Sequence, residues 1–272
     1  MSEESSVGDR YVLTTGDVGA RRLALLNSVY GPSTERLLAE ADVRPGMRVV
    51  DFGCGTGHTT VSLARLAGHS GSVVGVDASR EQLELARARA AELNLDNIEF
   101  VEASVYETQL ARGSFDAAYA RLILCHLQRP ADMLGEMLAV LKPGGILICE
   151  DLDISTLATD PPTEAYREIV QLSLELGRQR GVDYCMGAHL YHLLVQAGLR
   201  PQVRVVQPAF ASGEEKRVWE YTFLEAAPPI VAAGLASAEK IDELRHQLAH
   251  IAKDDRILVF QSRFVQFWAT IS

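Results

Sequence analysis

The sequence contains few cysteines, no basic stripe and no long uninterrupted apolar run, and each of these absences disfavours a class of protein. Its four cysteines are widely spaced and form no C-x-x-C pair, which disfavours a zinc knuckle or a disulfide framework. The net charge is −10 and no basic stripe is present, so nucleic acid is not expected as a partner. The apolar run at 226–238 is too short to span a bilayer. The chain also starts with polar and acidic residues rather than a signal peptide, so we expect a cytoplasmic protein without membrane contact.

Short apolar runs alternate with amphipathic segments in the middle of the chain. Nearly continuous runs rich in Val and Ile are typical of parallel strands buried on both faces. They occur at 47–52, 72–77 and 145–150, with weaker examples at 98–101 and 115–120. Residues 80–93 and 130–141 instead repeat their apolar side chains with the period of a helix. This alternation predicts right-handed βαβ units and a doubly wound α/β fold with a mostly parallel sheet.

A glycine-rich turn follows the first predicted strand. Asp51 stands at the end of that strand, and Gly53, Gly55 and Gly57 let the backbone approach a ligand with no Cβ in the way. Asp77 ends the next strand, 20 residues after Gly57. A carboxylate at this place can accept hydrogen bonds from both hydroxyls of a ribose. We therefore expect a nucleoside ligand outside the carboxyl ends of the strands.

The spacing of the turn distinguishes two kinds of nucleoside cofactor. A dinucleotide fingerprint reads G-x-G-x-x-G and binds a pyrophosphate at a helix N-terminus. Here His58 stands where the last glycine of that fingerprint would fall. The carboxylate of Asp51 would disfavour a pyrophosphate but suits a ligand with an ammonium and a sulfonium group. Both features favour S-adenosyl-L-methionine, and an NAD-dependent oxidoreductase is the weaker alternative.

Five segments then match, in the right order, the motifs of class I methyltransferases that use S-adenosyl-L-methionine. Residues 51–57 resemble the first motif of that family, 73–77 the second strand, 100–104 the segment beside adenine, 114–120 the fourth strand and 141–145 the turn into the fifth. The match covers about residues 41–153, and the segments 11–13, 22–23 and 187–199 are similar to bacterial small-molecule methyltransferases. The resemblance implies a seven-stranded Rossmann-like sheet with helical cap elements, and methyl transfer to a small-molecule acceptor.

The resemblance also implies which residues contact the cofactor. It places the methionyl part beside Asp51, Gly53, Cys54, Gly55, Thr56 and Gly57, the ribose at Asp77, and adenine at Ala103, Ser104 and Val105, with Ala78 as a further cofactor contact. Many relatives carry Asp where Ser104 stands, and a neutral hydroxyl accepts the bond from the adenine amino group less strongly. Tyr11 lies in the segment that resembles an N-terminal cap. Arg121 could hold the cofactor carboxylate or a substrate acid, or it could pack at the surface.

Candidate catalytic residues follow the fourth and fifth predicted strands. Methyl transfer mainly needs an aligned nucleophile and the exclusion of water, and a general base helps only when the nucleophile starts protonated. His126 is a candidate base, with a structural, hydrogen-bonded histidine as the alternative. Asp151 and Asp153 could bind a polar substrate, act as a base or cap a loop.

Two further clusters have plain structural explanations. His189 and His192 are neighbours on a predicted helix, where a solvated face is favoured over a metal site, so no metal is expected. Tyr184, Trp219, Tyr221 and Phe223 could line an aromatic substrate pocket or belong to the core. A catalytically inactive cofactor-binding scaffold is a remaining alternative, disfavoured by the intact glycine turn and Asp77.

The rest of the chain is mainly helical by its pattern, over 163–180, 188–198 and about 214–253. A strand is expected at 203–206 and a β-rich run at 256–271. No internal repeat or low-complexity linker divides the sequence, so we expect one methyltransferase domain over 1–272. Residues 1–40 would form a helical cap, 41–153 the cofactor-binding core, and 154–272 the substrate-side helices and closing strands. A homodimer could form through the cap helices and the closing strands.

Overall fold

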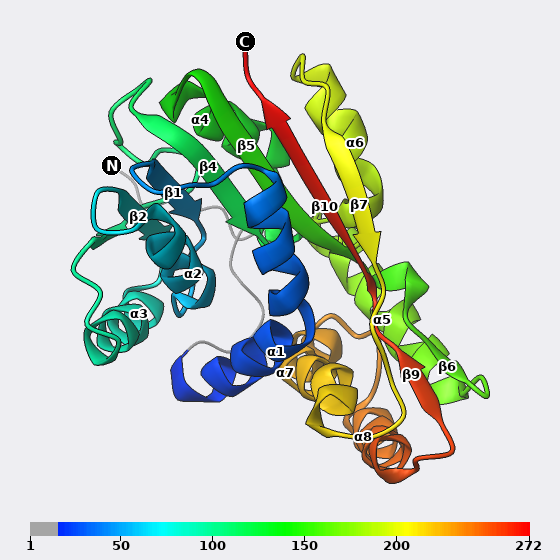
Figure 1. Ribbon diagram of the computed structural model, residues 1–272. Helices are drawn as coiled ribbons and strands as arrows, with labels where there is room; N and C mark the ends of the chain where they lie inside the picture. The colour runs from blue at the N-terminus through cyan, green and yellow to red at the C-terminus, as the bar shows by residue number, and fades with distance from the viewer. Residues whose placement is uncertain (1–15) are drawn as a thin grey trace, which may run out of the picture.

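A seven-stranded sheet forms the centre of the computed structural model, which describes residues 16–272. The strand order is β3-β2-β1-β4-β5-β10-β7, in which β1 to β5 run parallel and β10 runs antiparallel to β5 and β7 (Figure 1). The strands are β1 (Arg48–Phe52), β2 (Ser72–Asp77), β3 (Ile98–Glu102), β4 (Phe115–Arg121), β5 (Leu141–Asp153), β7 (Gln202–Val206) and β10 (Arg263–Thr270). The mostly parallel, doubly wound sheet predicted from the apolar runs is confirmed.

Two strand boundaries differ from the sequence prediction. The turn expected at 141–145 lies inside β5, which begins at Leu141 and shows an irregular register opposite Phe115 and Ala117. The β-rich run at 256–271 is two strands in two sheets, because β9 (Leu258–Phe260) pairs with β6 (Ala158–Asp160) and β8 (Ala209–Phe210), while β10 joins the central sheet.

Eight helices surround the two sheets in the described part of the chain. They are α1 (Gly16–Glu40), α2 (His58–Ala67), α3 (Arg80–Glu92), α4 (Pro130–Val140), α5 (Glu164–Arg180), α6 (Met186–Gln196), α7 (Val218–Ala232) and α8 (Ala238–Lys253). The helical stretch predicted at 214–253 is interrupted between α7 and α8. Gly234 takes φ 70° after α7, and the Ser237 hydroxyl accepts from the Lys240 N–H to begin α8.

The central sheet buries both of its faces. Val49 packs with Leu38 of α1 and Leu63 of α2 on one face. Its neighbour Val50 belongs to a different core, which contains Met137 of α4 and residues of α6. Adjacent residues of a strand point to opposite faces, so the two cores lie on opposite sides of the sheet.

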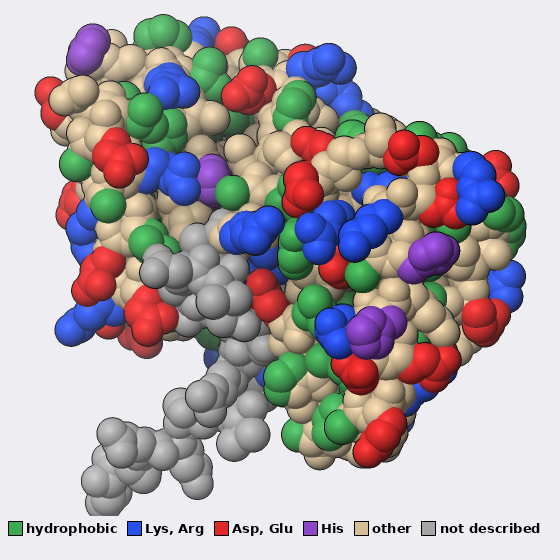
Figure 2. Space-filling view, turned by 90° about the horizontal axis from the view of Figure 1, so that it is seen from below, with side chains coloured by type: hydrophobic (Ala, Val, Ile, Leu, Met, Phe, Trp, Pro, Cys, Tyr) green, Lys and Arg blue, Asp and Glu red, His purple; other side chains and the backbone are tan. Residues whose placement is uncertain are grey.

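A third core joins the first half of α1 to α5, α7 and α8. It contains Tyr30, Ile169, Phe223 and Leu248. Figure 1 shows these helices gathered at the end of the sheet toward which β5 runs, so they form a cap beyond the carboxyl ends of the parallel strands. Seen from that end, the described surface carries intermixed acidic and basic side chains (Figure 2). None of the helices within residues 16–272 has the length and apolar character needed to cross a bilayer.

Candidate functional site

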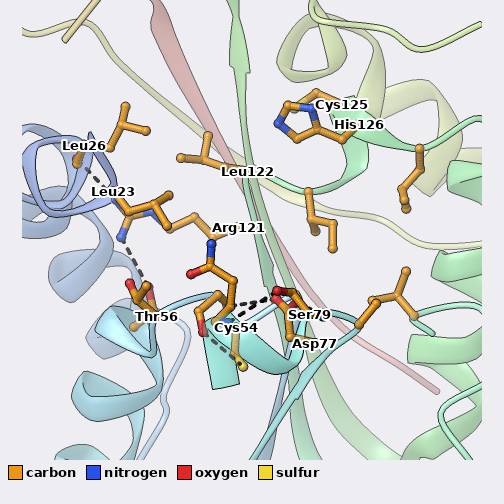
Figure 3. Close-up of a pocket in the computed structure, with 18 of the residues that line it drawn as sticks. Leu23, Leu26, Cys54, Thr56, Asp77, Ser79, Arg121, Leu122, Cys125 and His126 are labelled. Atoms are coloured by element: carbon orange, nitrogen blue, oxygen red, sulfur yellow. Dashed lines mark hydrogen bonds between the residues drawn. The ribbon is translucent and has the colours of Figure 1, made fainter. Parts of the chain in front are cut away.

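A cavity of about 1150 Å³ lies between the carboxyl ends of the strands and the cap. Small-molecule sites typically enclose about 300–1,000 Å³, so this cavity has room for a nucleoside cofactor and a second ligand. Figure 3 shows Leu23 and Leu26 of α1 on one side, Cys125 and His126 on the other, and Asp77 at the floor. The cavity therefore has a lower half at the glycine turn and an upper half beneath the cap.

The glycine turn approaches the cavity as the sequence predicts. Gly53 and Gly55 line it with φ of 69° and 52°, together with Cys54 and Thr56. A Cβ built on Gly53 would lie 2.1 Å from Cδ1 of Ile123, so a side chain at this position would disturb the cavity wall. Gly57 does not line the cavity. A Cβ there would lie 3.0 Å from the Cβ of Ala86, so this glycine allows α3 to pack closely at the start of α2.

Asp77 is held in one orientation between two loops. Its Oδ2 accepts the Gly55 N–H and its Oδ1 accepts the Ser79 N–H, both at 2.8 Å (Figure 3). Burial raises the pKa of this carboxyl group, and the two backbone donors oppose that rise. Each carboxylate oxygen retains further acceptor capacity. The residue can therefore accept hydroxyl groups of a ligand without giving up the bonds that shape the turn.

Asp51 is a buried acid at the end of β1. Its side chain is 3% exposed and accepts the Thr60 hydroxyl at 2.6 Å. Burial raises its pKa to about 7, and the positive charge of Arg121 works against that rise. A cationic ligand in the cavity would stabilise the ionised form in the same way. This buried carboxylate fits a ligand with an ammonium group and disfavours a pyrophosphate.

The segment expected beside adenine is only partly in the cavity. Ser104 and Val105 line it, together with Ala78, which follows the end of β2, whereas the Ala103 N–H donates to the Asp77 carbonyl at 3.1 Å and the residue lies outside. The Ser104 hydroxyl accepts the Tyr106 N–H at 3.3 Å. Tyr106 also lines this end, with Cζ of Arg129 4.3 Å above the centroid of its ring, and no sequence motif indicated either residue.

Arg121 connects the cap to the core at the cavity wall. Its Nη1 donates to the side chains of Asn27 in α1 and Thr59 in α2, at 3.0 and 3.2 Å. Its Nε is buried and has no hydrogen-bond acceptor within the described residues. Such orphaned donors are rare in folded proteins, which supports a ligand acceptor nearby. Arg121 thus has a structural role between α1 and α2, and it remains a candidate to bind an anionic group of a ligand.

The three candidate catalytic residues occupy different environments. His126 lines the cavity from the turn Leu124–His126. Asp151 is fully buried outside it and accepts the backbone N–H groups of Cys125 and Leu152 at 3.1 and 2.9 Å. Asp153 also lies outside it and accepts from the N–H and hydroxyl of Ser155. Both aspartates therefore stabilise the loops that position the cavity wall.

His126 has the environment of a neutral imidazole. Burial, with the positive charges of Arg22 and Arg180, lowers its pKa to about 3. Its ring packs edge-on against Tyr184 at 5.7 Å between centroids. A histidine with so low a pKa is a weak base at neutral pH, although it can still donate or accept a hydrogen bond.

The other candidate residues differ in their exposure and in whether they line the cavity. His189 and His192 are exposed on α6, and His189 contacts Asp183 at 2.5 Å. Within the described residues no cluster of side chains could hold a metal ion. Trp219 and Tyr184 line the cavity, but Phe223 is core and Tyr221 lies beneath arginines. Tyr11 falls outside the described residues.

The upper half of the cavity is mostly made of residues to which the sequence assigned no role in the site, although Leu23 lies in the segment 22–23 that resembles the cap of related methyltransferases. They are Leu23 and Leu26 of α1, Leu122, Leu152, Ile154, and Thr222 of α7. Arg22 joins them, with its Nε 2.9 Å from Oε2 of Glu225 on α7, and their side chains are 3% and 8% exposed. The spacing of apolar residues predicts that α7 is a helix, but nothing in the sequence indicates which of its faces covers the cavity.

Comparison with known proteins agrees with this geometry. A family model described as a methyltransferase domain matches residues 44–198. A putative methyltransferase from Bacillus halodurans has the same fold, with a TM-score of 0.60 at 19% identity over 86% of this chain and 96% of that chain.

Two curated relatives show similarity over part of their length. One is an uncharacterized 37.1 kDa protein in a transposon of Streptomyces fradiae, 34% identical over 60% of this chain and 46% of the relative. The other is a demethylmenaquinone methyltransferase of Staphylococcus aureus, 32% identical over 45% of this chain and 50% of the relative. The chain therefore spans about half the length of the curated relatives it matches.

Proposed function

This chain belongs to the methyltransferase-domain family, and from that premise we propose that it transfers a methyl group from S-adenosyl-L-methionine to a small-molecule acceptor. The observation that carries the proposal is the lower half of the cavity. There the glycine turn, the oriented carboxylate of Asp77 and the buried acid Asp51 stand together. A scaffold without a ligand has no need for this combination, and a pyrophosphate would meet Asp51.

The proposed site residues divide the work of binding. S-adenosyl-L-methionine supplies an electrophilic methyl group on a sulfonium. Gly53, Gly55 and their neighbours Cys54 and Thr56 would follow the methionyl part, with Asp51 facing its ammonium group. Asp77 would accept the ribose hydroxyls, and Ala78, Ser104 and Val105 would flank adenine. Arg121 would face the carboxylate of the cofactor, toward which its Nε–H is an available donor.

The cap would align the acceptor and exclude water. Leu26, Leu122, Leu152 and Trp219 form apolar walls above the glycine turn. Removing water strengthens the electrostatic interactions inside the site and holds the reactants close together. We propose that His126 hydrogen-bonds the acceptor as a neutral ring, and that Asp151 and Asp153 support the wall without touching it. One domain, a cytoplasmic location and a homodimer stay predictions.

The affinity for S-adenosylhomocysteine, whose ammonium group would face Asp51, should depend on pH. In the protein without ligand, burial raises the pKa of Asp51 to about 7, and a bound cation favours the ionised form of this side chain. Above pH 8 the group is already ionised, whereas below pH 7 binding must release its proton. We expect the dissociation constant to rise about 30-fold from pH 8 to pH 5.5, measured by isothermal titration calorimetry.

The matched control for this pH dependence is Asp51→Asn, which keeps the shape of the side chain and removes the titration. His58 and His126 have pKa values lowered to about 4 and about 3 by burial, so they stay neutral over this range. The variant should bind more weakly at pH 8 and show a nearly flat pH profile. An equally steep profile in the variant would remove Asp51 from the proposed cofactor site.

Direct tests of the function need both binding and turnover. S-adenosylhomocysteine at 100 times its dissociation constant should stabilise the protein by about 2.7 kcal/mol, which is measurable as a rise in Tm. Methyl-labelled S-adenosyl-L-methionine incubated with a metabolite extract should give a labelled small molecule detected by mass spectrometry. Stabilisation by NAD and not by S-adenosylhomocysteine would instead support the oxidoreductase alternative. Binding without any labelled product would favour the inactive scaffold.

A further inference from the structure

The charges in the cavity are distributed unevenly between its two halves. Within residues 16–272, the acidic side chains that line it are Asp51 and Asp77, and both lie in the half assigned to the cofactor. The upper half contains the guanidinium of Arg22 and the imidazole of His126. This half therefore has a cation and a neutral ring, with no carboxylate on its wall.

Arg22 is buried to an extent that is rare for a charged side chain. It is 3% exposed and is held from α7 by Glu225, which does not line the cavity. Arginines are almost never buried without a partner, and a guanidinium is well suited to binding oxygen anions in apolar surroundings. Glu225 orients Arg22 from behind, so the cationic member of the pair is the one presented to a ligand.

A second donor in the upper half also favours an anionic ligand over an ammonium group. Trp219 lines the cavity, and its buried Nε1–H has no acceptor within the described residues. A positively charged amine would meet Arg22 without a carboxylate to balance it, and desolvating that amine would be costly.

The walls of this half indicate the shape of its ligand. Leu23, Leu26, Leu122 and Ile154 are aliphatic, and the rings of Tyr184 and His126 meet edge-on at one side. Surfaces of this kind accept flat, apolar molecules, since aromatic groups bury a large area and pack edge-on or offset.

We propose that the methyl acceptor is a mainly apolar, ring-containing molecule whose nucleophile is an ionised oxygen bound by Arg22 and facing His126. This inference rests on the proposed methyl transfer. The acceptor oxygen supplies the electron pair for the new O–CH₃ bond, and the electron pair of the broken C–S bond stays on sulfur. An anion and a sulfonium give a neutral methyl ether or ester and a neutral thioether, so no proton has to be removed. The weak basicity of His126 is consistent with that balance.

Calorimetry with naphthalene probes tests the acceptor class separately from the function. S-adenosylhomocysteine is titrated first, and the saturated protein is then titrated with 2-naphthoate or with 2-naphthylmethylammonium, which share a ring and differ in charge. We expect 2-naphthoate to bind at least about tenfold more tightly, as one charge-assisted hydrogen bond predicts. Equal or tighter binding of the ammonium probe, or no binding of either probe, would overturn the acceptor class.

A double variant keeps the test specific to Arg22. Arg22→Gln alone leaves Glu225 buried without its cation, so it is combined with Glu225→Gln to give a neutral, hydrogen-bonding pair. The preference for 2-naphthoate should disappear, while the affinity for S-adenosylhomocysteine stays within about twofold, because Arg22 lies outside the cofactor half. A preference that survives in this variant contradicts the role of Arg22. Failure of the unchanged protein to bind S-adenosylhomocysteine would instead remove the proposed function, and the inference with it.

Discussion

Asp77→Ala is expected to weaken S-adenosylhomocysteine binding about 100-fold. The residue would accept both ribose hydroxyls through a carboxylate that Gly55 and Ser79 already hold in place. Hydrogen bonds to a charged group contribute about 1.5–3 kcal/mol each, so losing two of them costs about 3 kcal/mol or more. Calorimetry at pH 8 measures this change, and circular dichroism verifies that the variant is folded.

A neighbouring acid provides the control for Asp77. Glu102 ends β3 directly beside Asp77 in the register of the sheet, but it pairs with Arg80 at the surface and does not line the cavity. Glu102→Gln removes the same charge one strand away and should leave the affinity nearly unchanged. Equal losses in both variants would mean that net charge, rather than contact with the ribose, controls binding.

Glu225→Ala is expected to lower the free energy of unfolding by about 3–5 kcal/mol. The substitution leaves Arg22 buried between α1 and α7 without its counter-ion. Breaking one side of a buried ion pair has a cost of this size, because the remaining charge has lost both water and its partner. Urea unfolding followed by circular dichroism gives the value, with the denaturant midpoint compared at an unchanged m-value.

Two controls separate the buried pair from a general effect of charge. The neutral double variant Arg22→Gln/Glu225→Gln should recover most of the lost stability, since no uncompensated charge remains. Glu164→Ala breaks an exposed pair with Arg167 and should change stability little. A Glu225→Ala variant as stable as the Glu164→Ala variant would show that water reaches Arg22 and that the cap does not enclose it.

The residues of the lower half of the cavity could be predicted from the sequence because the motifs that indicate them are local. Gly53 and Gly55 need backbone conformations that glycine adopts readily, and each lies within a few residues of the strand that places it. Asp77 likewise ends a run whose apolar pattern identifies β2. Here a short strand and a tight turn place residues that are close in the sequence close together in space.

The upper half of the cavity could not be predicted from the sequence, because it depends on contacts between distant segments. Arg22 and Glu225 are 203 positions apart and meet only once α1 and α7 pack in the cap. His126 and Asp151 both follow predicted strands, but the pattern could not show that one faces the cavity and the other supports Cys125 from behind. Side-chain direction at a strand end depends on the loop beyond it, and the apolar pattern of the strand does not describe that loop.

The cap is not one piece of the chain. It consists of the first part of α1, the segment from β6 to α5, and the segment from β8 to β9, while β7 and β10 between and after them belong to the central sheet. An exchange of acceptor preference with a related enzyme therefore cannot be made by swapping a single fragment. Chimeras would have to replace three separate stretches together, or α1 and α7 would meet partners for which neither was selected. Point substitutions on the cavity wall are the simpler way to redesign this protein.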